Sequence, residues 1–226
     1  MEEQPTRSRT VRVRIALDVI CVHSFLGYTR FTRAADQLRA EGHRLEVEFL
    51  PFELAPGAGT EGEPLLPVLE RMFGPQTVRQ SLLFAEQVAA EGLELHYERA
   101  VATGTFEAHR LIARAARQGR AEQMVERLFR AHFTDGLHIG DGATLDQLAG
   151  EVGVTADDFG SGAAGTGPDT TAETERLRTE LDRVRRLGVG GVPVFFIDGV
   201  QPLTGSLSQA ALLAALREAA RLAPAG

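Results

Sequence analysis

Apolar and polar residues alternate in two segments near the start of the chain, and this pattern predicts two strands. The segments are VRVRIALD at 11–18 and RLEVEFL at 44–50, in which the apolar side chains share one face of an extended chain. Between them, from Ser24 onward, the apolar period becomes that of an amphipathic helix. The helical stripe consists of Tyr28, Phe31, Ala35 and Leu38. Gly42 then separates this helix from the second strand, which gives a β-α-β order.

The middle of the chain is predicted to be helical over about a hundred residues, because its apolar residues recur at helical spacing. It follows a loop rich in Pro and Gly, PFELAPGAGTEGEP at 51–64. The apolar stripes are Val78, Leu82, Ala85 and Ala89; Ala108, Leu111, Ile112 and Ala115; Ala121, Met124, Leu128 and Ala131; and Leu177, Leu181 and Val184. The glycine-rich GSGAAGTGP at 160–168 predicts a mobile connection before the last of these helices, which ends near Gly188.

The C-terminal part of the chain predicts a hairpin followed by a helix. PVFFID at 193–198 has the composition of a strand, Asp198-Gly199 is a turn signal, and VQPL at 200–203 is a candidate partner strand. Ser206 and Gln209 match a capping box at the start of the final helix.

Strands at both ends that enclose a helical middle predict an α/β protein with a second domain inserted into the first. We predict a discontinuous sheet-containing domain, residues 10–61 and 188–226, and an inserted helical domain, residues 62–187.

Composition narrows the classes of function. The 226 residues, 43% of them hydrophobic, are enough for a substantial core. A net charge of -7 argues against nucleic-acid binding, which needs a basic face. All 24 cationic side chains are arginine, so mechanisms that need a lysine Schiff base or a P-loop lysine are excluded.

Cysteine usage and hydropathy predict a cytoplasmic location. Cys21 is the only cysteine, so an intrachain disulfide is excluded and a reducing compartment is expected. The N-terminal residues contain no apolar segment typical of a secretory signal, and no run approaches the roughly 18 apolar residues of a membrane helix. We therefore expect neither a membrane nor a nucleic acid as a partner.

Cys21 lies where the first predicted strand gives way to the first helix, in the sequence Cys21-Val22-His23-Ser24. The unpaired N–H groups and positive dipole end of a helix N-terminus stabilise a thiolate, and can lower a cysteine pKa to about 3.5 to 7.5. His23 adds a titratable group and Ser24 a hydroxyl donor, so Cys21, His23 and Ser24 are the candidate catalytic residues. A buried, inert cysteine is the alternative, and the spacing alone leaves it open.

Four segments resemble motifs of the DsbA-like thioredoxin superfamily, and most closely those of its FrnE-like branch. DVICVHSFLGYTRF at 18–31 resembles D-x-x-C-P-W-C-Y-x-G, with Asp18, Cys21 and Gly27 in place and Phe25 as an aromatic residue. The other three segments, in the family's order, are GTFEAHRLIARAA at 104–116, LFRAHFTDGLHIGD at 128–141 and LGVGGVPVFFIDG at 187–199.

This resemblance implies a thioredoxin fold interrupted by a helical domain, with the sheet-containing segments as the thioredoxin-like part. It also implies a cis peptide between Val192 and Pro193, close to Cys21 in space. In relatives, the backbone before that proline pairs with a thiol ligand or a peptide substrate. The resemblance further implies a homodimer, although no exposed stripe in the sequence assigns an interface.

Ser24 replaces the second cysteine of the family's C-P-x-C, so the chain lacks the thiol that resolves a mixed disulfide internally. Three hypotheses stay open. Cys21 is a single-thiol exchange catalyst served by an external low-molecular-weight thiol, similar to glutathione or mycothiol. Alternatively, the fold supports non-redox, thiol-assisted isomerisation or tailoring of a small aromatic molecule, or it only binds a ligand.

The second hypothesis follows from the resemblance to two related branches, 2-hydroxychromene-2-carboxylate isomerases and kappa-class glutathione transferases. These carry serine at the position of Cys21 and position glutathione instead of forming a disulfide. FrnE-like proteins are also associated with aromatic polyketide antibiotic pathways, which implies a small-molecule substrate.

Further candidate residues for binding the substrate or the thiol come from several segments. They are Phe25, Phe52, Phe106, His109, Val192 and Pro193. His109 belongs to the helix that faces the active-site cleft in this family, and the phenylalanines would add apolar walls. Packing in the core is the alternative interpretation for each of these aromatic side chains.

Other polar residues receive minor roles. Asp18 ends the first strand and is a candidate to tune Cys21 from beneath. His132 and His138 show no recognisable metal-ligand spacing and have no cysteine partner, so no metal site is predicted.

Overall fold

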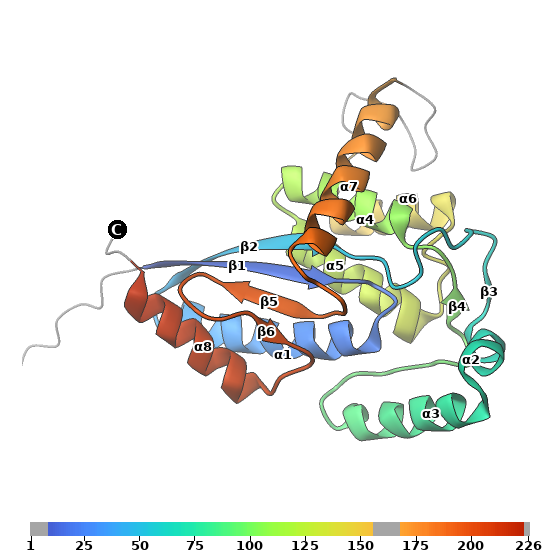
Figure 1. Cartoon of the computed structure of the whole chain (residues 1–226), viewed down its shortest axis with the longest axis horizontal. Coiled ribbons are helices and arrows are strands. Elements are labelled where there is room, and N and C mark those ends of the chain that lie inside the picture. The colour runs from blue at the N-terminus through green and yellow to red at the C-terminus, as the bar shows by residue number, and fades with distance from the viewer. Residues whose placement is uncertain (1–8, 156–167, 224–226) are drawn as a thin grey trace, which may run out of the picture.

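The computed structural model describes residues 9–155 and 168–223, and it is built around a four-stranded sheet (Figure 1). The strands are β1 (Thr10–Leu17), β2 (Arg44–Pro51), β5 (Val194–Ile197) and β6 (Leu203–Thr204), in the spatial order β2-β1-β5-β6. β1 and β2 are parallel, whereas β5 is antiparallel to β1, and β6 to β5. The predicted α/β class and the strand order along the chain are therefore confirmed.

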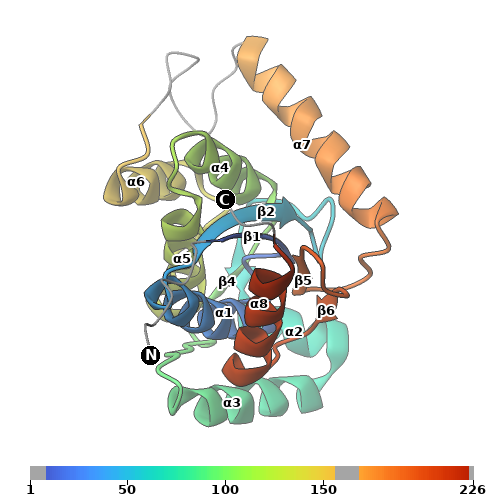
Figure 2. The ribbon, with the colours of Figure 1, turned by 90° about the vertical axis from the view of Figure 1, so that its left-hand side faces the viewer.

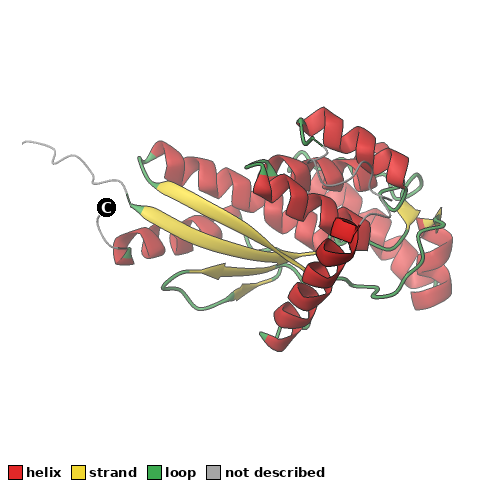
Figure 3. Cartoon of the chain, turned by 90° about the horizontal axis from the view of Figure 1, so that it is seen from above, coloured by secondary structure: helices red, strands yellow, loops and turns green. Residues whose placement is uncertain are grey.

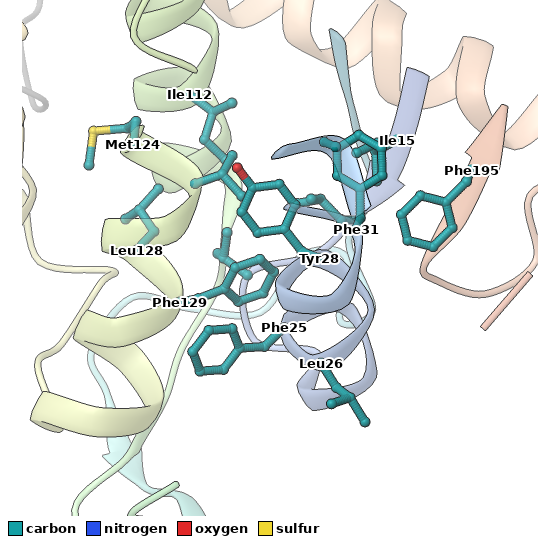
Figure 4. Close-up of a cluster of buried hydrophobic side chains, with 14 of the residues drawn as sticks. Ile15, Phe25, Leu26, Tyr28, Phe31, Ile112, Met124, Leu128, Phe129 and Phe195 are labelled. Atoms are coloured by element: carbon teal, nitrogen blue, oxygen red, sulfur yellow. The ribbon is translucent and has the colours of Figure 1, made fainter. Parts of the chain in front are cut away.

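Two helices cover one face of this sheet, as Figures 1 and 3 show. They are α1 (Val22–Ala40) and α8 (Gln209–Leu222), which also pack on each other. The apolar faces predicted from the alternating pattern meet here: the ring centroids of Phe31 in α1 and Phe195 in β5 lie 5.8 Å apart over the sheet (Figure 4). Burial of these side chains holds α1 against the sheet.

The middle of the chain is mostly helical, as predicted. Its elements are β3 (Glu63–Pro64), α2 (Leu65–Phe73), α3 (Pro75–Ala89), β4 (Val101–Ala102), α4 (Phe106–Arg117), α5 (Ala121–Arg130), a π-helical turn η1 (Ala131–Asp135), α6 (Gly142–Val152) and α7 (Pro168–Arg186). Of these, β3 and β4 form a short antiparallel sheet that the sequence did not predict. Phe129 of α5 stacks on Phe25 of α1, with ring centroids 5.0 Å apart (Figure 4). The helical part therefore shares a continuous core with the sheet. The domain boundaries drawn from the sequence stay a prediction.

The stripe of α3 is an exception to the predicted burial. None of its four residues is buried: Leu82 is 42% exposed, Ala89 is exposed, and Val78 and Ala85 are half-buried. The buried residue of α3 is Val88, outside the stripe. α2 and α3 contact each other and form an outlying pair of helices, visible in Figures 1 and 2. Helical spacing was therefore right for this segment, but the core covers its apolar face only in part, at Ala85.

Two further local predictions have a different outcome. The hydroxyl of Ser208, and not that of Ser206, caps α8, because it accepts the N–H of Ala211 at 3.2 Å. The Ser206 carbonyl instead accepts a hydrogen bond from Arg30 at 2.8 Å, since the loop after β6 is still turning at that point. The glycine-rich connection falls at 160–167 outside the described residues, and its Pro168 begins α7. Among the described helices, none combines the length and the hydropathy needed to cross a membrane.

Candidate active site

Cys21 occupies the junction between β1 and α1 that the sequence predicted. β1 ends at Leu17, and the chain turns so that the Cys21 N–H donates to the Asp18 carbonyl at 3.0 Å. Cys21 is then the N-cap residue of α1, and its own carbonyl accepts the first helical hydrogen bond, from Phe25 N at 3.0 Å. The sulfur therefore lies beside the unpaired N–H groups of the first helical turn.

The peptide bond between Val192 and Pro193 is cis, as the resemblance implied, and it lies against the thiol. The Cys21 Sγ donates to the carbonyl oxygen of Val192 across 3.5 Å. Sheet pairing explains this contact between distant residues: Ala16, near the end of β1, pairs with Val194 at the start of β5. The residues just after β1 and just before β5 are thereby brought to one edge of the sheet.

Gly27 lets α1 approach the cis proline. A Cβ atom on Gly27 would lie 2.9 Å from Cγ of Pro193, closer than ordinary packing allows. Gly27 is buried in the interior of α1, where glycine has a low helix propensity. Close approach of α1 to Pro193 gives a physical reason for glycine at this position.

The environment of Cys21 does not lower its pKa, contrary to the expectation from helix position. Burial raises the pKa of the thiol above its ordinary value, and the Asp18 carboxylate raises it further. The Ser24 hydroxyl and the backbone N–H groups of Ser24 and His23 lower the pKa, but by less. Cys21 is only 7% exposed, so loss of water around the sulfur outweighs the favourable helix terminus.

Beneath Cys21, Asp18 and His109 form a buried polar pair. Asp18 Oδ2 accepts the N–H of Leu54 at 2.8 Å, and its Oδ1 lies 3.6 Å from Nε2 of His109. The same Nε2 lies 3.0 Å from the carbonyl oxygen of Phe52. A carbonyl can only accept, so Nε2 carries the proton. Of the two tautomers of the imidazole, the hydrogen bond therefore selects the one with the proton on Nε2.

A family model described as DSBA-like thioredoxin domain matches residues 12–217, nearly the whole chain. The chain belongs to this family. The DSBA-like match includes both the segment around Cys21 and the cis proline. A curated relative, the uncharacterized protein YwbO of Bacillus subtilis, is 29% identical over 157 residues, which cover 67% of this chain and 71% of YwbO.

Solved structures show the same DSBA-like fold. A probable DsbA oxidoreductase from Streptomyces coelicolor is 26% identical, with a TM-score of 0.76 and coverage of 92% of this chain and 89% of that one. Cytosolic disulfide reductase DsbM from Pseudomonas aeruginosa, also solved with GSH, is 23% identical, with a TM-score of 0.59 over 94% and 100% of the two chains. A 2-hydroxychromene-2-carboxylate isomerase is 16% identical, with a TM-score of 0.60 over 93% and 95%.

The other candidate side chains of this DSBA-like chain make their contacts with residues other than Cys21. His23 is exposed and its ring meets Phe84 of α3 edge-on at 5.2 Å. Phe25 is a core residue stacked on Phe129, and Phe106 is half-buried beneath the guanidinium of Arg178 at 5.8 Å. Phe52 is buried, and its contribution to the site comes from its backbone carbonyl.

Ser24 is the catalytic candidate whose side chain acts on the Cys21 thiol. Its Oγ is fully buried, and its hydroxyl acts on the thiol by lowering the Cys21 pKa. In the resting geometry this hydroxyl has no hydrogen-bond partner among the described residues, so it is available to the sulfur. Ser24 therefore occupies the place of a resolving cysteine without being able to form a disulfide.

His132 is a buried polar residue to which the sequence gave no role beyond ruling out a metal. Its ring is fully buried in η1 and meets the ring of Phe133 edge-on at 4.5 Å. Neither ring nitrogen has a hydrogen-bond partner among the described residues, and burial lowers the pKa of His132 to about 4. The Asp18 carboxylate acts on the same ring in the opposite direction. In the described part of the chain, no three His, Cys, Asp or Glu side chains are grouped to hold a metal ion.

Proposed function

We propose that this DSBA-like chain is a thiol-disulfide exchange enzyme that works through one thiol, that of Cys21. The contact between the sulfur and the cis Val192-Pro193 peptide carries the proposal, because the backbone before this proline is where the resemblance implies that a substrate or thiol ligand pairs. The thiol-disulfide oxidoreductases and isomerases among its relatives support the class of reaction.

The proposed cycle balances without a second cysteine. The Cys21 thiol loses its proton to solvent, and the thiolate attacks one sulfur of a disulfide; a new sulfur–sulfur bond forms, the old one breaks, and the second sulfur leaves as a thiolate. An external thiolate then attacks the substrate sulfur bound to Cys21. That step forms a new external disulfide and returns Cys21 as a thiolate.

Ser24 and Val192 have separate roles in this cycle. The Ser24 hydroxyl stabilises the Cys21 thiolate as a hydrogen-bond donor. Once Cys21 is in a mixed disulfide it has no proton to donate, so the Val192 carbonyl is free to accept from an amide or amine of the bound molecule.

We infer that the external thiol is a small peptide-like thiol of the glutathione or mycothiol kind, and that the enzyme acts in the cytoplasm. The fold shared with a cytosolic disulfide reductase that was solved with GSH supports both inferences. The likeness to the FrnE-like branch supports an aromatic small molecule, such as a polyketide, as the substrate.

A chain with a restored second cysteine tests the proposal. A peptide–glutathione mixed disulfide serves as substrate, and release of the free peptide is followed with and without added glutathione. Peptide and glutathione released without added thiol are counted together. We expect the natural chain to release one equivalent in all and to turn over only with added glutathione, Cys21→Ala to release none above the uncatalysed rate, and Ser24→Cys to release two equivalents, one of peptide and one of glutathione, as its two cysteines form a disulfide. Ser24→Ala, which removes the hydroxyl without adding a thiol, is the matched control and should release one equivalent in all, as the natural chain does. Equal turnover by Cys21→Ala would overturn the single-thiol mechanism.

The raised pKa of the Cys21 thiol favours a second candidate function, glutathione-dependent isomerisation without redox change. The shared fold with a 2-hydroxychromene-2-carboxylate isomerase supports this alternative. Conversion of 2-hydroxychromene-2-carboxylate in the presence of glutathione tests this alternative. Conversion retained in Cys21→Ser would favour isomerisation, since a serine can position a thiol cofactor but cannot exchange disulfides. Absence of both activities would favour a protein that only binds its ligand.

A further inference from the structure

A cavity of about 400 Å³ lies between β2, α4 and α7, away from the thiol. Its walls include Leu17 and Phe49 from the sheet, Ile112 and Ala116 from α4, and Arg176 and Leu177 from α7. Neither Cys21 nor Val192 nor Pro193 belongs to these walls. The volume is within the range of small-molecule sites, which is roughly 300–1,000 Å³.

The space arises from small side chains on α4. Ala113 and Ala116 are one turn apart on the side of α4 that lines the cavity, so α7 passes this helix without filling the gap between them. Figure 2 shows α7 along the outside of the molecule, beyond α4 and β2. Phe49, Ile112 and Leu177 give the cavity an apolar lining.

The charged side chains of this cavity form two groups, one mainly basic and one acidic. Around Glu173, at the N-terminal half of α7, Arg110 and Arg117 form ion pairs at 3.3 Å and 2.5 Å. Arg117, Arg110 and Arg114 all act to lower the pKa of Glu173. Arg176, nearly one turn further along α7 on the same wall, has no ion pair with any described residue. This group therefore holds more positive than negative charge.

The other group is acidic. Glu180 is hydrogen-bonded to Arg183, and it raises the pKa of that guanidinium together with the more distant Glu48. Glu48 and Glu180 both line the cavity, whereas Arg183 does not. A ligand with a negative group is therefore favoured only with that group toward Arg176.

We propose that this cavity is a second binding site, separate from the thiol, for a small aromatic molecule that carries one carboxylate. The aromatic part contacts Phe49, Ile112 and Leu177, and the carboxylate pairs with Arg176. The site is distinct from the proposed exchange site because the buried His109, tied to the Phe52 carbonyl, stands between the cavity and Asp18 beneath Cys21.

Calorimetric titration with 2-naphthoate, and with its neutral analogue 2-naphthamide, tests this proposal at pH 7. We expect the carboxylate to bind five- to tenfold more tightly than the amide, and Arg176→Gln to abolish that preference. Ala116→Leu, which fills the cavity, should remove binding of both probes. Ala214→Leu, at an exposed alanine of α8, is the matched control and should bind like the natural chain.

Cys21→Ser separates this proposal from the proposed function. Unchanged naphthoate affinity in Cys21→Ser supports a second site whether or not the thiol is catalytic. Loss of affinity in that variant would place the probe at the thiol and overturn the proposal. Binding that survives Ala116→Leu, or no binding of either probe to the natural chain, would also overturn it, and equal affinity for the two probes would overturn the carboxylate assignment.

Discussion

The Sγ atom of Cys21 lies 3.5 Å from the carbonyl oxygen of Val192, a residue 171 positions away in the chain, and donates a hydrogen bond to it. A carbonyl oxygen can only accept, so this contact requires the protonated thiol. Ionisation of Cys21 therefore breaks the contact and frees both the sulfur and the Val192 carbonyl. In the resting protein the Cys21 thiol occupies the Val192 carbonyl. The carbonyl becomes available to another donor only when Cys21 loses its proton.

The first prediction concerns the pH at which Cys21 reacts. Burial raises the pKa of the thiol above its ordinary value of 9.0, so alkylation by iodoacetamide should rise with pH through a midpoint above 9.0. Because Cys21 is the only cysteine, the same chain in urea provides the reference. A midpoint in the folded protein below that of the unfolded chain would contradict the environment described for Cys21.

A second prediction concerns the charge of Asp18. The carboxylate raises the pKa of Cys21, so Asp18→Asn should shift the alkylation midpoint to lower pH, by up to about one unit. Asparagine can still accept the N–H of Leu54, which preserves the local backbone. Glu53→Gln is the control: this half-buried carboxylate is not among the groups that shift the Cys21 pKa, so the midpoint should stay in place. An upward shift in Asp18→Asn would be inconsistent with the proposed influence.

His132 should make the fold sensitive to acid. Its pKa falls from 6.5 to about 4 in the folded protein, so the unfolded chain binds its proton first as the pH drops. The contribution of neutral His132 to the free energy of unfolding is fully present above about pH 6.5. Between pH 6.5 and pH 4 the free energy of unfolding falls by about 3 kcal/mol as this contribution is lost. His132→Phe should remove this part of the acid sensitivity in urea unfolding at pH 7 and pH 4, while other groups titrate as before.

The control for this experiment is His96→Gln, which replaces a half-exposed histidine paired with Glu98. That variant should keep the acid sensitivity of the natural chain. Equal loss of stability between pH 7 and pH 4 in His132→Phe and in the natural chain would show that His132 is not the group responsible.

The fourth prediction compares two glycines within helices. Gly27→Ala places a methyl group 2.9 Å from Pro193, so we expect the free energy of unfolding to fall by about 1–3 kcal/mol despite the better helix propensity of alanine. Gly150→Ala in α6 meets no atom within 4 Å and should be stabilising by up to about 1 kcal/mol. Urea unfolding measures both, and a stabilising Gly27→Ala would refute the close packing of α1 on the cis proline.

Local patterns in the sequence identified much of the fold, because strand and helix periods are properties of short segments. The alternation at 11–18 and 44–50 located β1 and β2, and the stripe through Tyr28 and Phe31 located α1. The same approach located α3 but misjudged the burial of Leu82, since burial depends on whether another element covers that face. Motif resemblance placed Cys21 beside Val192-Pro193, a pairing that no local pattern contains.

By itself, the sequence determined the order of the elements, the position of the single cysteine at a strand–helix junction and the absence of a second cysteine at Ser24. Tertiary structure alone decided the direction of the Cys21 pKa, the pairing of Asp18 with His109, the burial of His132 and the cavity lined by Ala113 and Ala116. The physical reason is that desolvation and cavity shape depend on side chains from distant segments. Residue spacing within one segment carries no information on either desolvation or cavity shape.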